Sequence, residues 1–364
     1  MYKKITLIFT CLLCLALIGV SCKKKEQTEK KHTLTESEMT SMVKDFIQKA
    51  EKSVHDGKAD FLNNAVDTVA LKAAVEKKSS ALDIGAGMEI FYGNCSFGDY
   101  LCDIEESGGS FRFDTTYVKN GQHHVVLRTY DGNGNFQFED LLMGFQNGKA
   151  VIKDAFLYSI TSCLSDKIAS ETILNVFMTI DSPTEDARNM ITVTALCANG
   201  EYQQMWKLLN EQKNQLQQFT SFYKFYTIGL HACSTNFTSD LEALRNDGAD
   251  ERFILYHQLC HAIRIGDAEA AMQHISKLID YTGDDPIYWV LYAKALTNAQ
   301  QYKEALAAYN TAKQGMDYIW DIWTGELTCY KRLRDTETFN NCLLAGKILY
   351  GLSDDEIADM GRNF

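Results

Sequence analysis

The sequence predicts an α+β protein in which helices and an antiparallel four-stranded sheet are followed by an all-α superhelix. Three observations lead to this prediction: four strand-like runs separated by glycine turns, helical periodicity from about residue 183 onward, and an apolar N-terminal segment. Of 364 residues, 46% are hydrophobic and 23% are charged, as in ordinary globular proteins. The net charge of −12 argues against a nucleic-acid partner, because phosphate binding requires a basic surface.

The N-terminus has the layout of an export signal. A short basic start precedes 16 almost unbroken apolar residues, Ile5 to Val20, fewer than the ~20 residues of a comfortable membrane span. Small residues precede Cys22, and three lysines follow it directly. This pattern resembles a bacterial lipoprotein signal, in which the chain is cleaved before the cysteine and acyl chains are attached to it. An ordinary secretory signal that is cleaved elsewhere is the alternative.

The lipoprotein resemblance implies a signal peptide at residues 1–21, lipidation of Cys22 and a lipid-anchored flexible tether at residues 22–33. Residues 23–31 of this tether carry five lysines and two glutamates. Some Gram-negative lipoproteins carry an acidic run here as a surface-export signal, and this chain does not. The expected location is therefore the cell envelope of a Gram-negative-type bacterium, anchored in a membrane and facing the periplasm.

The first folded region is expected at residues 34–180. A capping box, Thr35-x-x-Glu38, opens a helix whose apolar residues recur at helical spacing. Two shorter helices follow, at 60–66 and 69–77. Asn-Gly and Asp-Gly turns, which supply the positive φ angles of tight hairpins, then separate four β-rich runs and predict an antiparallel meander. The runs are Ser110–Val118, His123–Asp131, Asn135–Phe145 and Lys149–Thr161, and a helix from Lys167 to Met178 closes the region.

Helices followed by a long antiparallel sheet resemble the cystatin-like fold of the nuclear transport factor 2-like superfamily. The resemblance covers most of residues 34–180 and rests on topology and turn placement. It implies a curved sheet wrapped around the helices, with a cone-shaped cavity between them. In that superfamily the cavity is an enzyme site, a ligand pocket or only part of a dimer-forming scaffold, and the fold does not decide among these.

Few side chains in this region suit chemistry in such a cavity. The residues of the dipeptides His123-His124 and Glu139-Asp140 point to opposite faces of a strand, so neither dipeptide acts as a pair. One of the two histidines is expected to face solvent beside the turn. A cross-strand dyad would join His124 to Asp114 or Asp154. Solvated charges near strand ends are the simpler interpretation, and no catalytic residue is assigned.

The second region, residues 183–364, is helical and repetitive. The stretch from Pro286 to Ala312 resembles a tetratricopeptide repeat, in which small residues let two helices approach closely. The resemblance places in the repeat core Trp289, Ala293, Ala305, Tyr309 and Ala312. A shift by one repeat length, about 34 residues, adds Trp323 and Tyr330 and aligns the helix-to-helix turns Gly266-Asp267, Gln300-Gln301 and Arg334-Asp335. Ser353-x-x-Glu356 begins a last helix that is expected to shield the open end of the array.

The tetratricopeptide resemblance also implies a concave groove, built by the first helix of each pair, that binds a protein or peptide. The residues expected in this groove are Ile287, Val290, Lys294, Trp320, Thr324 and Thr328. Trp289 and Trp323 are expected in the core and not in contact with the partner. The aromatic run Phe222–Tyr226 is also expected to be buried.

Cysteine and histidine spacing indicates neither a metal site nor a redox site. The eight cysteines after Cys22 include no Cys-x-x-Cys pair, and buried free thiols are the default interpretation, with Cys95–Cys102 as the best local disulfide candidate. His257 and His261 share a helix face, with Cys260 between them and His274 on the paired helix. The glutamate of a His-Glu-x-x-His hydrolase is missing, so neither a metal nor another cofactor is assigned.

The sequence therefore predicts a lipid-anchored envelope protein that is not an enzyme and acts as an interaction scaffold. The expected partner is an envelope protein or peptide bound by the helical repeats. The alternative is small-ligand binding or weak enzymatic activity in the cystatin-like cavity. Neither a phosphate loop in a strand–helix context nor a Gly-x-Ser-x-Gly elbow occurs in the sequence.

Overall fold

The computed structural model describes residues 34–79, 95–131, 135–179, 184–217, 219, 221–316 and 319–363. The expected signal peptide, Cys22 and the tether lie outside these residues. The chain divides after Met39 into two units, and residues 40–364 form one of them. In the first unit the predicted capping box is confirmed: the Glu38 amide donates to Thr35 Oγ1 at 3.3 Å, and the Thr35 amide donates to Glu38 Oε2 at 2.8 Å.

The helices before the sheet lie close to their predicted ranges, as α2 (Glu36–His55), α3 (Asp60–Ala65) and α4 (Thr68–Ser79). A further helix, α6 (Phe97–Glu106), was not expected from the sequence. It crosses the start of α3 so closely that a Cβ on Gly98 would lie 2.1 Å from the carbonyl oxygen of Ala59. Glycine is therefore required at this crossing.

The predicted meander is confirmed as an antiparallel sheet with strand order β1-β2-β3-β4-β5. Its main strands are β1 (Ser110–Lys119), β2 (Gln122–Tyr130), β3 (Phe136–Gln146) and β4 (Lys149–Leu157). The turns at Asn120-Gly121 and Asn147-Gly148 have positive φ at both residues, as tight hairpins demand.

The sheet differs from the prediction in having a fifth strand. The run expected from Lys149 to Thr161 ends at Leu157, where the 3₁₀ turn η2 (Tyr158–Ile160) begins. Thr161 then takes a left-handed conformation with φ of 47°, which reverses the chain. The short strand β5 (Ser162–Cys163) consequently pairs back onto β4.

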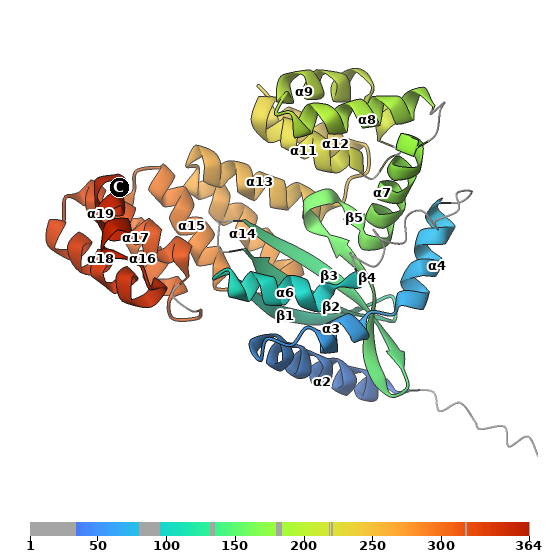
Figure 1. Cartoon of the computed structure of the whole chain (residues 1–364), viewed down its shortest axis with the longest axis horizontal. Helices are drawn as coiled ribbons and strands as arrows, with labels where there is room; N and C mark the ends of the chain where they lie inside the picture. Colours follow the sequence, from blue (N-terminus) through green and yellow to red (C-terminus); the bar gives the residue numbers. More distant parts are fainter. Residues whose placement is uncertain are drawn as a thin grey trace, which may run out of the picture. The chain divides into compact units, whose positions relative to one another are not determined.

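Paired helices follow the sheet, as predicted (Figure 1). Left-handed residues occur at Gly266, Gln300 and Arg334, so the same helix-to-helix turn recurs once per expected repeat length. None of the described helices combines the length and the apolar content that a bilayer crossing requires. The helices are α7 (Leu164–Thr179), α8 (Glu185–Ala198), α9 (Tyr202–Glu211), α10 (Lys213–Leu216), α11 (Ser221–Cys233), α12 (Phe237–Asn246), α13 (Glu251–Ile265), α14 (Ala268–Thr282), α15 (Ile287–Asn298), α16 (Tyr302–Ala312), α17 (Trp320–Leu333), α18 (Thr336–Tyr350) and α19 (Asp354–Asn363).

Most of the predicted repeat core is buried, namely Ala293, Ala305, Tyr309, Ala312 and Trp323. Gly325 allows α17 to approach the Tyr309 ring, because a Cβ there would lie 2.2 Å from the Tyr309 hydroxyl. The prediction for Trp289 was wrong: this side chain is 38% exposed, and Tyr330 is only partly buried. Trp289 is displaced because α15 turns Tyr288 and Leu291 into the core instead. The aromatic run on α11 is mostly buried, as expected.

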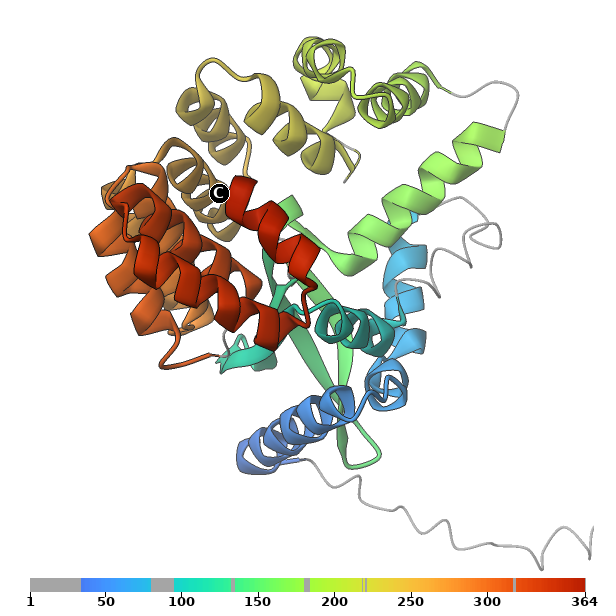
Figure 2. The ribbon, with the colours of Figure 1, turned by 60° about the vertical axis from the view of Figure 1, so that its left-hand side comes forward.

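The sheet has a hydrophobic core on each face. One face packs against α2, α3 and α6 through side chains such as Phe46, Leu62, Leu101 and Leu127. The other packs against α13–α15, where Phe138 stacks on Tyr288 with ring centroids 5.6 Å apart. In Figures 1 and 2 the sheet accordingly lies between α2 and these later helices. The second core contains side chains from residues 34–180 and from residues 183–364, which were expected to form separate domains.

A buried ion pair lies in this second core. Arg128 on β2 donates from Nε to Asp285 Oδ2 at 3.1 Å, and the two side chains are 3% and 0% exposed. Asp285 also accepts a hydrogen bond from the amide of Ile287, at the start of α15. Asp114 on β1 lies near this pair. Burial raises the pKa of Asp114 to about 9, and the negative charge of Asp285 is the next largest cause of the rise. The sheet is thus linked to α15 by charges removed from water.

We expect Arg128→Met to destabilise the protein by about 3–5 kcal/mol, because the change leaves Asp285 buried without its cation. Urea denaturation of the full chain measures this loss. Lys49→Met removes an ion pair whose side chains are more than half exposed, and should change stability by less than about 1 kcal/mol. Equal effects of the two substitutions would contradict the role assigned to Arg128.

Candidate functional site

Four of the six predicted groove residues line one depression on the helical surface. This depression, called the groove below, has a volume of about 560 Å³. Lys294 on α15 and Asp321 on α17 form an ion pair across it. The lining residues are Ile263, Lys294, Thr297, Asn298, Tyr309, Trp320, Asp321, Thr324, Gly325 and Thr328.

The other two predicted groove residues were assigned wrongly. Ile287 and Val290 are both fully buried. They belong to the core that joins α15 to the sheet, and side chains in that core cover the first turns of α15. Only the later turns of α15 therefore contribute to the groove.

The groove offers hydrogen-bond acceptors beside aromatic rings. The hydroxyls of Thr297, Thr324 and Thr328 each donate to the carbonyl four residues earlier, at 2.8–3.0 Å. A hydroxyl oxygen that donates in this way still has lone pairs to accept a hydrogen bond. Trp320 and Tyr309 supply apolar surface next to these acceptors. Such a mixture of polar and aromatic groups is suited to an extended polypeptide.

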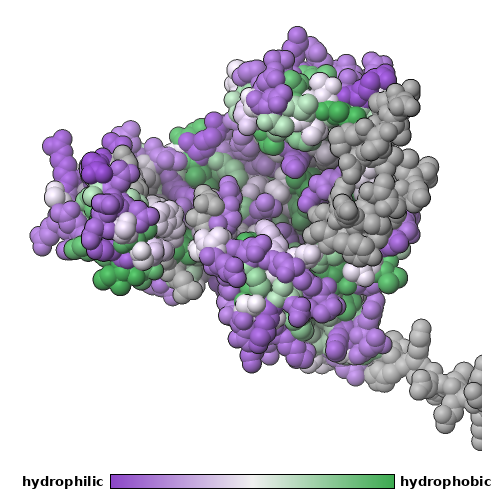
Figure 3. Space-filling model, viewed as in Figure 1, coloured by the Kyte–Doolittle hydropathy of each residue, from purple (hydrophilic) through white to green (hydrophobic). Residues whose placement is uncertain are grey.

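A second candidate site, called the sheet cavity below, lies between α6, α7 and the sheet. It has a volume of about 330 Å³ and is lined by Ser96, Phe97, Tyr100, Gln137, Glu139, Ala155, Leu157, Leu164 and Lys167. An adjoining depression of similar volume shares Gln137, Leu157 and Lys167 with it and extends to His257 on α13. Figure 3 shows a recess in the surface between α6 and helices α11–α13.

Glu139 is the most unusual group in the sheet cavity. The residue is only 6% exposed, and burial raises the pKa of its carboxyl to about 7, against the opposing positive charge of Lys167. Nearby, the Tyr100 hydroxyl lies 3.4 Å from Thr129 Oγ1. The expectation that Glu139 is a solvated charge near a strand end was wrong, because α6 and α7 cover that part of β3.

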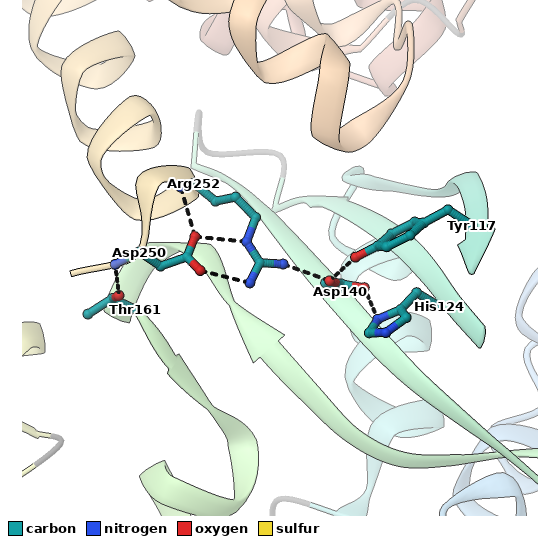
Figure 4. A network of polar contacts seen from close by, with 6 residues as sticks. All are labelled: Tyr117, His124, Asp140, Thr161, Asp250 and Arg252. Carbon is teal, nitrogen blue, oxygen red and sulfur yellow. Dashed lines mark hydrogen bonds and ion pairs between the residues drawn. The ribbon is translucent and has the colours of Figure 1, made fainter. Parts of the chain in front are cut away.

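Asp140, the next residue of β3, faces the opposite side of the sheet in a network of charges (Figure 4). Its carboxylate lies 2.9 Å from Nδ1 of His124 and accepts hydrogen bonds from Tyr117 and from Nη1 of Arg252. Arg252 also makes two hydrogen bonds to Asp250, at 2.9 and 3.0 Å. Burial raises the pKa of Asp140, but the hydrogen bonds and charges outweigh it and hold this pKa below its ordinary value.

The dyads that the sequence suggested for His124 do not form. Asp114 lies beside Asp285, and Asp154 accepts hydrogen bonds from the amide and hydroxyl of Ser165. His124 pairs with Asp140 instead, on the face that packs on α13. The expectation that one histidine of the pair faces solvent was also wrong, since His123 is 5% exposed and the His124 side chain 15%. We regard the Asp140 network as a structural joint, because Tyr117, His124 and Arg252 occupy its carboxylate.

The histidines of α13 bind other protein groups. His257 Nε2 lies 3.1 Å from the Ser159 carbonyl and must donate to it, so His257 Nδ1 accepts from His231 Nε2 at 3.0 Å. The His261 ring stacks on Phe237 with centroids 3.9 Å apart. Within the described residues, no group of three or more His, Cys, Asp or Glu side chains is arranged to hold a metal ion. Cys95 and Cys102 are both buried free thiols, so the candidate disulfide is not formed.

Sequence reasoning missed most of the charged residues that join the sheet to the helices. The contacts between Arg128 and Asp285 and between Arg252 and Asp140 join residues more than 100 positions apart. No local pattern identifies such pairs. Helix α6, which lines the sheet cavity, could have been predicted from the sequence. Its apolar residues Phe97, Leu101 and Ile104 recur at helical spacing.

Comparison of the chain with protein-family models, with curated proteins and with solved structures found no match.

We expect acid to destabilise the protein because His231 and His257 are held uncharged in the folded state. Burial lowers the pKa of His257 to about 3 and that of His231 to about 4, whereas both are about 6.5 in an unfolded chain. The stabilisation is therefore complete above pH 6.5 and is lost as the pH falls toward 4. By linkage, the two groups should lower the free energy of unfolding by about 3 kcal/mol between pH 8 and pH 5.5.

Urea denaturation at several pH values tests this prediction. His231→Phe should reduce the pH dependence by about half. His55→Gln changes a histidine whose side chain is 63% exposed and should retain the wild-type pH dependence. An unaltered pH dependence in His231→Phe would show that the pair does not control acid stability.

Proposed function

We propose that this chain is a lipid-anchored cell-envelope protein that recruits a protein or peptide partner to the groove. The observation that carries the proposal is that Lys294, Trp320, Thr324 and Thr328, from two successive helix pairs, line one depression. A surface built jointly by neighbouring units of a helical array is the usual binding surface of solenoid proteins. The proposed role is binding alone, without a catalytic step.

The likeness to tetratricopeptide repeats supports this proposal. Helices α13 to α18 follow one another in pairs. The left-handed turn that joins the two helices of a pair recurs at the repeat length of about 34 residues. Small residues at helix contacts, such as Gly325 against Tyr309, allow the close packing that such arrays need. The likeness of residues 34–180 to the nuclear transport factor 2-like fold belongs to the same proposal, with this part acting as a base for the helices.

The groove favours an extended peptide that donates hydrogen bonds and carries an apolar side chain. The threonine hydroxyls of α15 and α17 accept from donors in the peptide, and Trp320 offers a surface for the apolar group. The Lys294–Asp321 pair supplies one charge of each sign. Charged side chains of the peptide are therefore favoured in one orientation over the reverse.

The membrane anchor is proposed from the sequence around Cys22. Several acyl chains on one cysteine would hold the protein firmly, at about 0.8 kcal/mol for each buried methylene. The tether lacks the acidic run that serves as a surface-export signal in some lipoproteins, so the folded part would face the periplasm of a Gram-negative-type envelope. The helical array would then meet its partner at the membrane surface.

We expect Cys22→Ala to abolish incorporation of radiolabelled palmitate in growing cells, because the change removes the proposed acceptor thiol. Cys14→Ala should label normally, since Cys14 belongs to the segment that is expected to be cleaved off. Labelling that persists in Cys22→Ala would refute the lipid anchor and leave the groove proposal in place.

We expect a photo-crosslinking amino acid at Thr328 to trap a defined partner in intact cells. The same amino acid at Lys303, an exposed position on α16 outside the groove, should trap none. Thr324→Arg should reduce the yield at position 328 at least tenfold, because the larger side chain fills the groove. Lys303→Glu should leave the yield unchanged.

Mass spectrometry of the adduct identifies the partner, and circular dichroism confirms that each variant is folded. Equal crosslinking from positions 328 and 303 would overturn the proposed function. A correctly folded Thr324→Arg variant that crosslinks with unchanged yield would overturn it as well.

A further inference from the structure

Glu139 contributes a carboxyl group to the sheet cavity. Glu139 is only 6% exposed, and it lines the cavity. Among the residues that the structure describes, no N–H or O–H group donates a hydrogen bond to it. Carboxyl groups of largely buried residues normally have a hydrogen-bond partner, supplied by the protein or by water. The cavity in front of Glu139 is where that partner can come from.

A second charge of opposite sign lines the same cavity. Lys167 on α7 is close enough to lower the pKa of Glu139 by its positive charge. An ammonium group has three N–H donors, so Lys167 can add a ligand to the contacts that it already makes. The cavity therefore presents one anion and one cation to whatever enters it.

The remaining walls of the cavity are largely apolar. Phe97 and Tyr100 stand one turn apart on α6, with ring centroids 6.5 Å from each other, and Ala155, Leu157 and Leu164 complete the lining. The volume of about 330 Å³ is at the lower end of the ~300–1,000 Å³ that small-molecule sites occupy. A ligand for this site is consequently small, partly apolar and carries one positive and one negative group.

We propose that the sheet cavity binds a small zwitterion, an α-amino acid with an apolar side chain. Its ammonium group pairs with Glu139 and its carboxylate pairs with Lys167. Its side chain lies against Phe97, Leu157 and Leu164. Each charged group meets the opposite charge next to the largely buried Glu139, and a low local dielectric strengthens such contacts. This site is separate from the groove, so the proposal does not depend on the proposed function.

The titration of Glu139 adds a signature that a merely structural carboxyl would not give. Only the ionised carboxylate pairs with an ammonium group, and burial raises the pKa of Glu139 to about 7. The ammonium group of an amino acid remains charged from pH 6 to pH 8. Affinity should therefore rise about tenfold over this interval, because the ionised fraction of Glu139 rises by that factor.

Isothermal titration of the full-length protein with L-leucine, and then with the other proteinogenic amino acids, tests the proposal. Glu139→Gln and Lys167→Met should each weaken binding at least tenfold, and Glu139→Gln should also abolish the pH dependence. Two variants provide matched controls: Glu171→Gln and Lys224→Met make the same changes in the adjoining depression and should bind normally.

Two truncated ligands give a test that does not depend on the folding of any variant. Isoamylamine keeps only the ammonium end of leucine, and 4-methylpentanoate keeps only the carboxylate end. Each should bind at least tenfold more weakly than leucine. The proposal is overturned if no amino acid binds at millimolar concentration, if Glu139→Gln binds as the wild type does, or if either truncated ligand binds as tightly as leucine.

Discussion

The buried ion pair between Arg128 and Asp285 holds the helices in position on the sheet. Asp285 also accepts the Ile287 amide at the start of α15, so one carboxylate connects strand β2 with the beginning of a helix pair. Removing a charge from water is expensive unless its partner is placed accurately, and a misplaced α15 would leave two buried charges uncompensated. This requirement favours one arrangement of α15 on the sheet over others with similar hydrophobic contact.

A second joint, around Asp140, ties α13 to the sheet at another point. Strand β3 contributes one residue to this joint and the preceding residue to the sheet cavity. Consecutive side chains of a strand point to opposite faces, so Glu139 reaches the sheet cavity while Asp140 reaches Arg252 on the other side. The joint therefore supports the strand that carries Glu139. Helix α7 supplies Lys167 to the same cavity, so sheet and helix together define its charges.

Local patterns predicted the elements of this protein well. Asn-Gly turns located the hairpins, because few other dipeptides accept two successive positive φ angles. The repeat interval located the helix-to-helix turns for a similar reason, since each of them needs a left-handed residue. Exposure was harder to predict. Trp289 occupies a core position in the repeat pattern and yet lies at the surface, because the sheet, which has no counterpart in an isolated repeat, draws another face of α15 inward.

By itself the sequence determined most of the helices and strands, the turns and the repeat interval, since these follow from backbone preferences over a few residues, whereas α6 and β5 were missed. It also predicts an export signal that ends before Cys22, because such a pattern is linear. Only the tertiary structure decided which charges meet and which are buried. Glu139 and Lys167 line one cavity, and Lys294 and Asp321 cross one groove, because separate elements pack together there. Contacts between distant segments depend on packing, which no local pattern in a single sequence records.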